Sequence, residues 1–128
     1  MVTFTGMDKS KAHLVDAPKR FQGKVYHQVL VGEDDSDEMT ATAVYFDDGA
    51  RTLPHTHDCD QILAVVEGTC VVADETEKRN LTVGDYAFVQ KGRWHWHGAA
   101  RGNSACHISI RKNGETDWNP EQRDWDQH

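Results

Sequence analysis

Two short segments of the chain each hold a pair of histidines separated by one residue. The first segment, from Gly49 to Gly68, contains His55 and His57, and Gln61 follows four positions later. Successive side chains in an extended strand point to opposite faces, so these two imidazoles project from the same side. Two imidazole nitrogens aimed at one point, with an amide oxygen nearby, form part of a shell for a divalent metal ion.

The second segment, RWHWHGA, repeats the same spacing with His95 and His97. A third imidazole from this segment would complete a metal shell. The two segments lie far apart in sequence, so the fold must bring them together.

Short strands are the elements that must position these side chains. Residues that suit a pleated sheet, separated by turn residues, predict strands at 21–31, 39–46, 61–66, 69–73, 81–83, 86–89, 94–97 and 105–111. Glu67 and Gly68 predict a hairpin between two of these strands, and the polar stretch 74–80 predicts a loop. Asn119 and Pro120 predict the start of a short C-terminal helix over 121–127.

Such a pattern, with almost no helical periodicity, is typical of an all-β antiparallel barrel or double-sheet jelly roll. A length of 128 residues corresponds to one domain. We expect an N-terminal arm at 1–20, which reaches across to a partner subunit as an edge strand, a barrel at 21–118 and a C-terminal tail at 119–128.

The composition of the chain indicates which classes of molecule it is not expected to bind. The chain has 14 basic and 21 acidic residues and a formal charge of -7, which argues against nucleic acid and anionic membrane as partners. No apolar run is long enough to span a bilayer, and the first residues lack the apolar core of a secretory signal. The three cysteines are an odd number without CxxC spacing, so a reducing cytoplasm is the expected location.

The central half of the chain resembles the cupin family. The first cupin motif requires a glycine, a His-x-His pair, an acidic residue and a closing glycine, and the matching positions at the required spacings are Gly49, His55, His57, Gln61 and Gly68. The second motif is matched by Gly84, Gly92 and His95, with Gln90 in place of a proline and Ala99 in place of an asparagine.

This resemblance implies a small double-stranded β-helix, or jelly-roll, barrel that holds a divalent metal ion in its mouth and forms a homodimer. It implies manganese or iron as the ion, with zinc or nickel as alternatives. The ligands that it implies are His55, His57, Gln61 and His95.

A narrower resemblance follows from Gln61, the sequence HWHGA and His107. Over about 44–118 the chain is similar to cupins associated with carboxymuconolactone decarboxylases, a branch that includes small manganese-dependent hydroxynitrile lyases. Gln61 is neutral where most metal cupins have glutamate, so the site keeps the full +2 charge of the ion. That charge makes the ion a stronger Lewis acid and lowers the pKa of bound water further.

The remaining site candidates follow from strand alternation. His97 shares the face of His95 and, if it is not a ligand, is the candidate general acid or base. His107 matches a site-lining position of the resembling branch and is the second catalytic candidate. Arg111 shares a face with His107, and we expect it to orient an anionic or carbonyl substrate. Thr42 and Val44 would form the opposite wall, completing the substrate-binding set.

Plainer interpretations stay open for several of these residues. Gln61 could lie outside the metal shell, His97 and His107 could be structural hydrogen-bonding residues, and Arg111 could be a charge on the barrel rim. Cys59 could approach the metal or be an inert buried thiol. We expect His13, His27 and His128 at the surface.

Three functions are compatible with this pattern. The first is a metal-dependent enzyme acting on a small oxygenated carbon compound as a lyase or decarboxylase. The second is an Fe(II) dioxygenase, because the same open site could hold oxygen beside its substrate. The third is a non-catalytic metabolite or metal sensor, which would not require His97 and His107 in the barrel.

Overall fold

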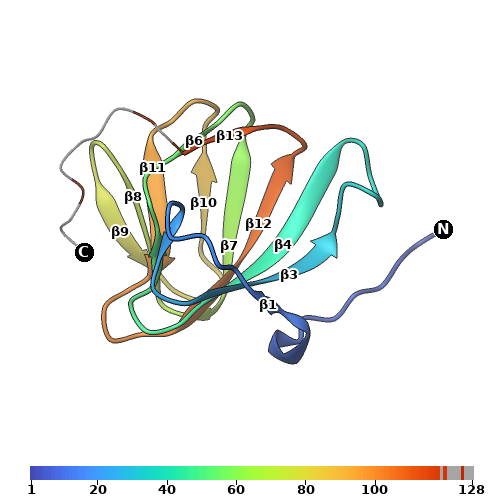
Figure 1. Ribbon diagram of the computed structural model, residues 1–128, viewed down its shortest axis with the longest axis horizontal. Helices are drawn as coiled ribbons and strands as arrows, with labels where there is room; N and C mark the ends of the chain where they lie inside the picture. Colours follow the sequence, from blue (N-terminus) through green and yellow to red (C-terminus); the bar gives the residue numbers. More distant parts are fainter. Residues whose placement is uncertain (119, 121–124, 126–128) are drawn as a thin grey trace.

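The computed structural model describes residues 1–118, Pro120 and Trp125. Within these residues the regular structure is β-strand, apart from one turn of 3-10 helix, η1 (Lys9–Lys11). The strands form two larger sheets and one additional strand pair, and every pairing is antiparallel. Figure 1 shows the sheets curving around a common interior. The predicted all-β jelly roll is confirmed.

The six-stranded sheet has the order β1-β3-β4-β12-β7-β10. Its strands are β1 (His13–Leu14), β3 (Val25–Val31), β4 (Met39–Phe46), β7 (Gln61–Gly68), β10 (Tyr86–Val89) and β12 (Ala105–Lys112).

The five-stranded sheet has the order β2-β5-β11-β8-β9, and β13 pairs with β6 in a sheet of their own. The strands are β2 (Phe21–Gln22), β5 (Arg51–Thr52), β6 (Thr56–His57), β8 (Cys70–Asp74), β9 (Lys78–Leu81), β11 (His95–Ala99) and β13 (Thr116–Asp117). Figure 1 shows β6 and β13 crossing one end of the barrel.

Alternation of side chains builds the core between the sheets. β4 spans the predicted residues, and its inward Val44 and Phe46 pack with Val65 from β7 and Cys70 from β8. Each of these four side chains is at most 5% exposed. Burying an aliphatic or aromatic side chain stabilises the fold by about 1.5–3 kcal/mol. The core therefore fixes which face of each strand looks inward, including the faces that hold the histidines.

The predicted hairpin at Glu67–Gly68 is wrong. β7 pairs with β12 and β10, whereas β8 pairs with β11 and β9 in the other sheet. Gly68 has a φ of +67°, and a Cβ atom there would clash with the carbonyl oxygen of Ser104. The chain therefore crosses from one sheet to the other at this glycine instead of pairing back on itself.

Two other predictions require correction. The strand predicted at 21–31 divides at Gly23, which has a φ of +81°, so β2 and β3 belong to different sheets. The loop predicted at 74–80 contains most of β9, an edge strand paired with β8. The first three side chains of β9 are polar and exposed, so its sequence lacks the apolar alternation that marks a strand.

The N-terminal arm contains η1 and β1, and β1 pairs with β3 of the same chain. Met7 and Ala12 from this arm pack against the outer face of the six-stranded sheet. The helix predicted at 121–127 lies outside the described residues, except for Trp125, whose ring packs on Trp96. His128 also lies outside them. Among the described residues, no helix has the length and apolar character needed to cross a membrane.

Candidate metal centre

A short backbone bridge brings the two histidine segments together. The amide of His55 donates to the carbonyl of His95 at 3.0 Å, and the amide of His95 donates back to the carbonyl of His55 at 3.2 Å. The two ring centroids are 4.3 Å apart. This bridge joins residues forty positions apart in sequence, and it places their imidazoles on the inside of the barrel.

Three imidazoles form the tightest group. Ligand nitrogens of His55, His95 and His97 all lie within 4.8 Å of one another, and all three residues are buried. The ring centroid of His57 lies 4.9 Å from that of His55 and 5.3 Å from that of His95. The structure therefore collects all four predicted histidines, with His97 inside the tight group and His57 beside it.

Backbone oxygens fix the tautomers of two of these rings. Nδ1 of His55 lies 2.8 Å from the carbonyl oxygen of Leu53, and Nδ1 of His95 lies 2.9 Å from that of Arg93. A carbonyl oxygen can only accept, so each Nδ1 carries the hydrogen. Nε2 of both rings is left with a free electron pair. Fixing the tautomer through the other ring nitrogen is typical of metal-binding histidines.

Side chains from other strands orient the next two candidate ligands. Nδ1 of His57 lies 2.9 Å from the hydroxyl of Thr116 on β13. The side-chain amide of Gln61 donates to the hydroxyl of Ser109 at 2.8 Å, which directs its Oε1 away from that contact.

Several polar atoms of the site are buried without a hydrogen-bond partner among the described residues. They are His57 Nε2, Gln61 Oε1, His95 Nε2, His97 Nε2 and His107 Nδ1. Leaving such an atom unsatisfied costs about 1–3 kcal/mol. Three of the four residues that the resemblance implies as ligands, His57, Gln61 and His95, thus present buried atoms without a partner, and a divalent cation would satisfy them. The donor set fits a metal ion of the imidazole- and oxygen-binding class.

The Nδ1 atom of His97 contacts another imidazole, whereas the Nδ1 atoms of the other three histidines contact oxygen atoms. Nδ1 of His97 lies 2.9 Å from Nε2 of His107, a fully buried ring on β12. Either imidazole can donate in this contact, so no neighbouring carbonyl dictates the tautomer of His97 through Nδ1. Phe46 packs against both rings. The contact therefore links the tautomers of the two buried rings.

Burial keeps the imidazoles uncharged. It is the main cause that lowers the pKa of His55 and His97 well below 6.5, with the neighbouring histidines adding to the effect. Burial also lowers the pKa of His57 and of His107 to about 3. The pKa of His95 falls for the same reason. Neutral imidazoles have the free electron pair that metal binding and general base catalysis both require.

The metal-free protein is expected to lose stability as the pH falls from 7 to 5. The unfolded chain takes up a proton on each histidine near pH 6.5, whereas folded His107 stays neutral until about pH 3. Below pH 6.5 the unfolded state therefore binds more protons, and the free energy of unfolding falls with pH. For His107 alone the loss at pH 5 is about 2 kcal/mol.

Urea unfolding of metal-free protein at pH 7, 6 and 5 measures this loss. The His107→Gln variant should lose about 2 kcal/mol less than the wild type over this range. The His13→Gln variant is the control, because His13 is exposed on β1, and it should match the wild type. If the free energy of unfolding of the wild type does not change between pH 7 and 5, the buried imidazoles are not held neutral.

A cavity of about 210 Å³ opens beside the imidazoles. The site residues among its lining are Thr42, Val44, His55, His57, Gln61, His97, Ser109 and Arg111. The three residues predicted to bind substrate are thus on its wall, and His57 and Gln61 face it with them. At about 30 Å³ per molecule, this space corresponds to about seven waters. The cavity is sized for a small organic compound.

Sequence reasoning missed several side chains of the site. His27 was expected at the surface but lines the cavity, and burial lowers its pKa. Thr116 and Trp118 follow the last long strand, and they close the cavity because β13 pairs with β6. Trp118 lies over His55 with ring centroids 4.3 Å apart. The pairing of β13 with β6 gave no recognisable signal in the sequence.

Comparisons with known proteins identify similar chains. Residues 43–110 match the family described as Cupin domain. The chain is 32% identical over 93 residues to an (R)-mandelonitrile lyase from Granulicella tundricola, covering 72% of this chain and 71% of that one. It is 41% identical over 61 residues to the pectin degradation protein KdgF from Dickeya dadantii, covering 47% of this chain and 56% of the relative.

A solved structure is also similar to this chain in fold and in sequence. The crystal structure of a cupin-like protein from Thermotoga maritima superposes with a TM-score of 0.76 at 30% sequence identity. The match covers 80% of this chain and 81% of that one.

Proposed function

Because this chain belongs to the cupin family, we propose that it is a metal-dependent enzyme with lyase or decarboxylase-like activity on a small oxygenated carbon compound. The similarity to a mandelonitrile lyase supports the class of reaction. The cavity beside the imidazoles supports a small substrate.

One observation carries the proposal: two segments that are distant in sequence bring buried polar atoms without hydrogen-bond partners to one site. Among the described residues they belong to His57, Gln61, His95 and His97. A non-catalytic metal site would need the first three, but it would not need a fourth imidazole with its own buried partner, His107. The extra pair favours proton chemistry next to the ion.

We assign the ligands as His55, His57, His95 and the amide oxygen of Gln61. Three imidazoles and an amide suit manganese or iron, with zinc and nickel as weaker alternatives. When bound, the ion supplies Lewis acid catalysis toward an oxygen atom of the substrate. No ligand in this set is charged, so nothing in it offsets the charge of the cation.

The other residues bind the substrate and move its proton. His97 takes or returns a proton through Nε2, and the 2.9 Å contact of its Nδ1 with His107 links the tautomers of the two rings. Thr42 and Val44 form one wall of the cavity, and Arg111 orients the substrate. Trp118 and Thr116 cover the site and limit the entry of water.

Turnover without oxygen tests this function. Protein loaded separately with manganese or iron is assayed under nitrogen with hydroxynitriles, hydroxy acids and β-diketones. We expect bond cleavage in the absence of oxygen, and at least about a hundredfold lower kcat in the His97→Gln variant with unchanged metal content. Turnover that requires oxygen would assign a dioxygenase instead. Tight ligand binding without any turnover would assign a sensor.

We also propose that the protein is a homodimer that buries the outer face of β7 and β10. Ile62, Tyr86 and Phe88 form an exposed apolar group there, with Phe88 opposite Ile62 on the neighbouring strand. Tyr86 is 71% and Phe88 is 64% exposed. Contiguous exposed apolar side chains of this kind mark interaction surfaces.

The Phe88→Asp variant is expected to be monomeric, because a buried carboxylate without a partner would oppose association. Light scattering coupled to size-exclusion chromatography measures the mass. Val29→Asp is the matched control: Val29 is 61% exposed but lies on β3, which β4 and β12 separate from β7. A wild-type monomer, or a dimer disrupted equally by both changes, would contradict this interface.

A further inference from the structure

The cavity wall contains one permanent cation and no carboxylate. Its lining contains no aspartate, glutamate or lysine, and Arg111 is its only arginine. Arg111 is therefore the only permanently charged side chain in this lining.

The donors of Arg111 are largely unused. The guanidinium has five N–H donors, and its one hydrogen bond among the described residues is a long contact of 3.4 Å from Nη1 to the carbonyl of Gly114. No ion pair to Arg111 occurs among those residues, although its side chain is partly buried. The barrel does not need this charge for its own hydrogen bonding.

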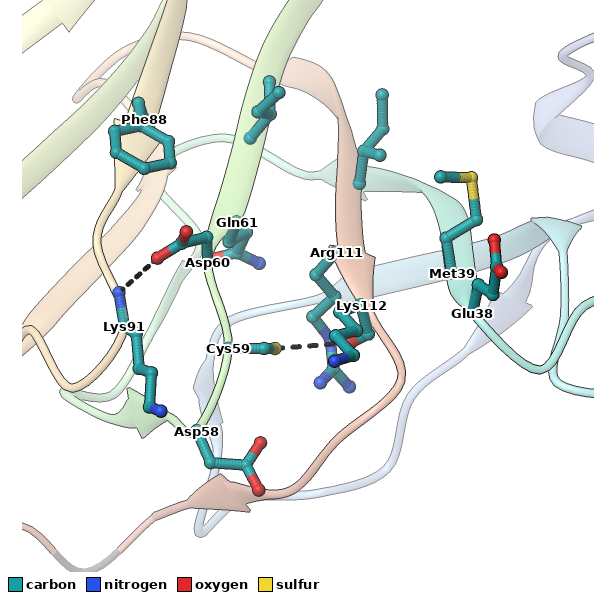
Figure 2. Close-up of a pocket in the computed structure, with 12 residues that line it drawn as sticks. Glu38, Met39, Asp58, Cys59, Asp60, Gln61, Phe88, Lys91, Arg111 and Lys112 are labelled. Carbon is teal, nitrogen blue, oxygen red and sulfur yellow. Dashed lines mark hydrogen bonds between the residues drawn. The ribbon is translucent and has the colours of Figure 1, made fainter.

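Three carboxylates lie near Arg111 without forming an ion pair with it. Arg111 also lines a second cavity of about 690 Å³, whose wall includes Glu38, Asp58 and Asp60. Figure 2 shows the Arg111 side chain reaching from β12 toward the segment of Cys59 and Asp58. Asp58 accepts from the amide of Glu115 at 2.8 Å, and Asp60 accepts from the amide of Lys91 at 2.9 Å. Among the described residues none of these carboxylates forms an ion pair with Arg111, so its guanidinium can still bind a ligand.

The register between β12 and β7 places Arg111 next to Gln61, one of the proposed metal ligands. Arg111 pairs with Gln61 across β12 and β7, so both side chains project from the same face at neighbouring positions. An arginine fork recognises a carboxylate with two parallel hydrogen bonds. A ligand between the two groups can therefore present a carboxylate to Arg111 and a second oxygen to the metal ligands.

We propose that the natural substrate is a small hydroxy or oxo carboxylate, held by its carboxylate on Arg111. This inference rests on the proposed function for the role of the second oxygen, but the anchoring by Arg111 does not depend on the metal. The structure favours an anion over a neutral hydroxynitrile, because the lining offers a positive charge and no negative group to balance it.

Calorimetric titration with a charged ligand and a matched neutral ligand tests whether Arg111 binds the carboxylate of the substrate. Lactate and lactamide have the same carbon skeleton and hydroxyl, and only lactate is charged. Wild-type protein loaded with manganese is expected to bind lactate at least about tenfold more tightly than lactamide, a difference of about 1.4 kcal/mol. Arg111→Gln should abolish this preference with lactamide binding unchanged, and Arg111→Lys should keep part of it, because lysine retains the charge without the fork.

Arg101→Gln is the matched control, because Arg101 is exposed and lines neither cavity. It should behave as the wild type. Equal affinity of the wild type for lactate and lactamide, or equal weakening of both ligands in Arg111→Gln, would overturn the proposal. Tighter binding of inorganic phosphate than of lactate would also overturn it, by assigning the cation to phosphate.

Metal-free protein separates this proposal from the proposed function. Titration of lactate and lactamide, followed by the NMR signal of the Arg111 guanidinium, should keep the preference for lactate without metal. If the protein binds no metal but keeps the preference, the proposed function fails and the carboxylate anchor stands. If metal binds normally and the preference is absent, the anchor alone fails.

Discussion

Replacing His57 with alanine is expected to weaken manganese binding by at least about 100-fold. The ring has a free, buried Nε2, and its Nδ1 contacts Thr116. Loss of a residue that merely orients a ligand already costs about 10–100-fold in affinity, so loss of a ligand should exceed that range. Isothermal titration of metal-free protein with manganese measures the dissociation constant.

His97→Ala is the informative comparison, because His97 belongs to the tightest group of imidazoles and His57 lies beside it. If His97 is the acid–base residue, its loss should change manganese affinity less than about tenfold, even though turnover collapses. The reverse pattern, in which His97→Ala loses the metal and His57→Ala keeps it, would show that His55, His95 and His97 hold the ion.

Replacing Gln61 with glutamate is expected to raise manganese affinity and lower kcat. A carboxylate in place of the amide adds a negative charge next to the cation, and about 1.4 kcal/mol of added attraction already gives a tenfold change in affinity. The same charge weakens the ion as a Lewis acid. We therefore expect affinity to rise and kcat to fall, each by at least about tenfold. Titration and steady-state kinetics on metal-loaded protein measure the two effects.

The Gln61→Met variant separates charge from coordination. Methionine keeps the length and neutrality of the side chain but lacks the amide oxygen, so affinity should fall instead of rising. Ser109, which contacts the amide nitrogen of Gln61 at 2.8 Å, is intact in both variants. Equal affinity in the wild type, Gln61→Glu and Gln61→Met would mean that Oε1 lies outside the metal shell.

Local strand structure could be predicted from sequence, but the partner of each strand could not. The alternation from Met39 to Phe46 identified β4 and its inward face correctly. The same reasoning misread Gly68, because a short turn between two strands looks alike in a hairpin and in a crossing between sheets. The difference depends on the packing of Gly68 against Ser104, a contact distant in sequence.

In the candidate site, too, the positions within one strand could be predicted, whereas contacts that depend on strand pairing could not. Spacing within each segment placed His55, His57 and His95 on inward faces, and parity placed Arg111 on the cavity wall. Thr116 and Trp118 could not be predicted, because they reach the site through the pairing of β13 with β6. Parity also placed His97 on the face of His95, but it could not show that His97, and not His57, belongs to the tight imidazole group.

Elemental analysis of protein purified without added metal tests the central claim most directly. We predict about one manganese or iron ion per chain in the wild type, because imidazole and amide donors select that class of ion. The double variant His57→Ala with His95→Ala should contain essentially none and remain folded by circular dichroism. A wild type without bound metal, or a double variant with the same metal content, would contradict the account.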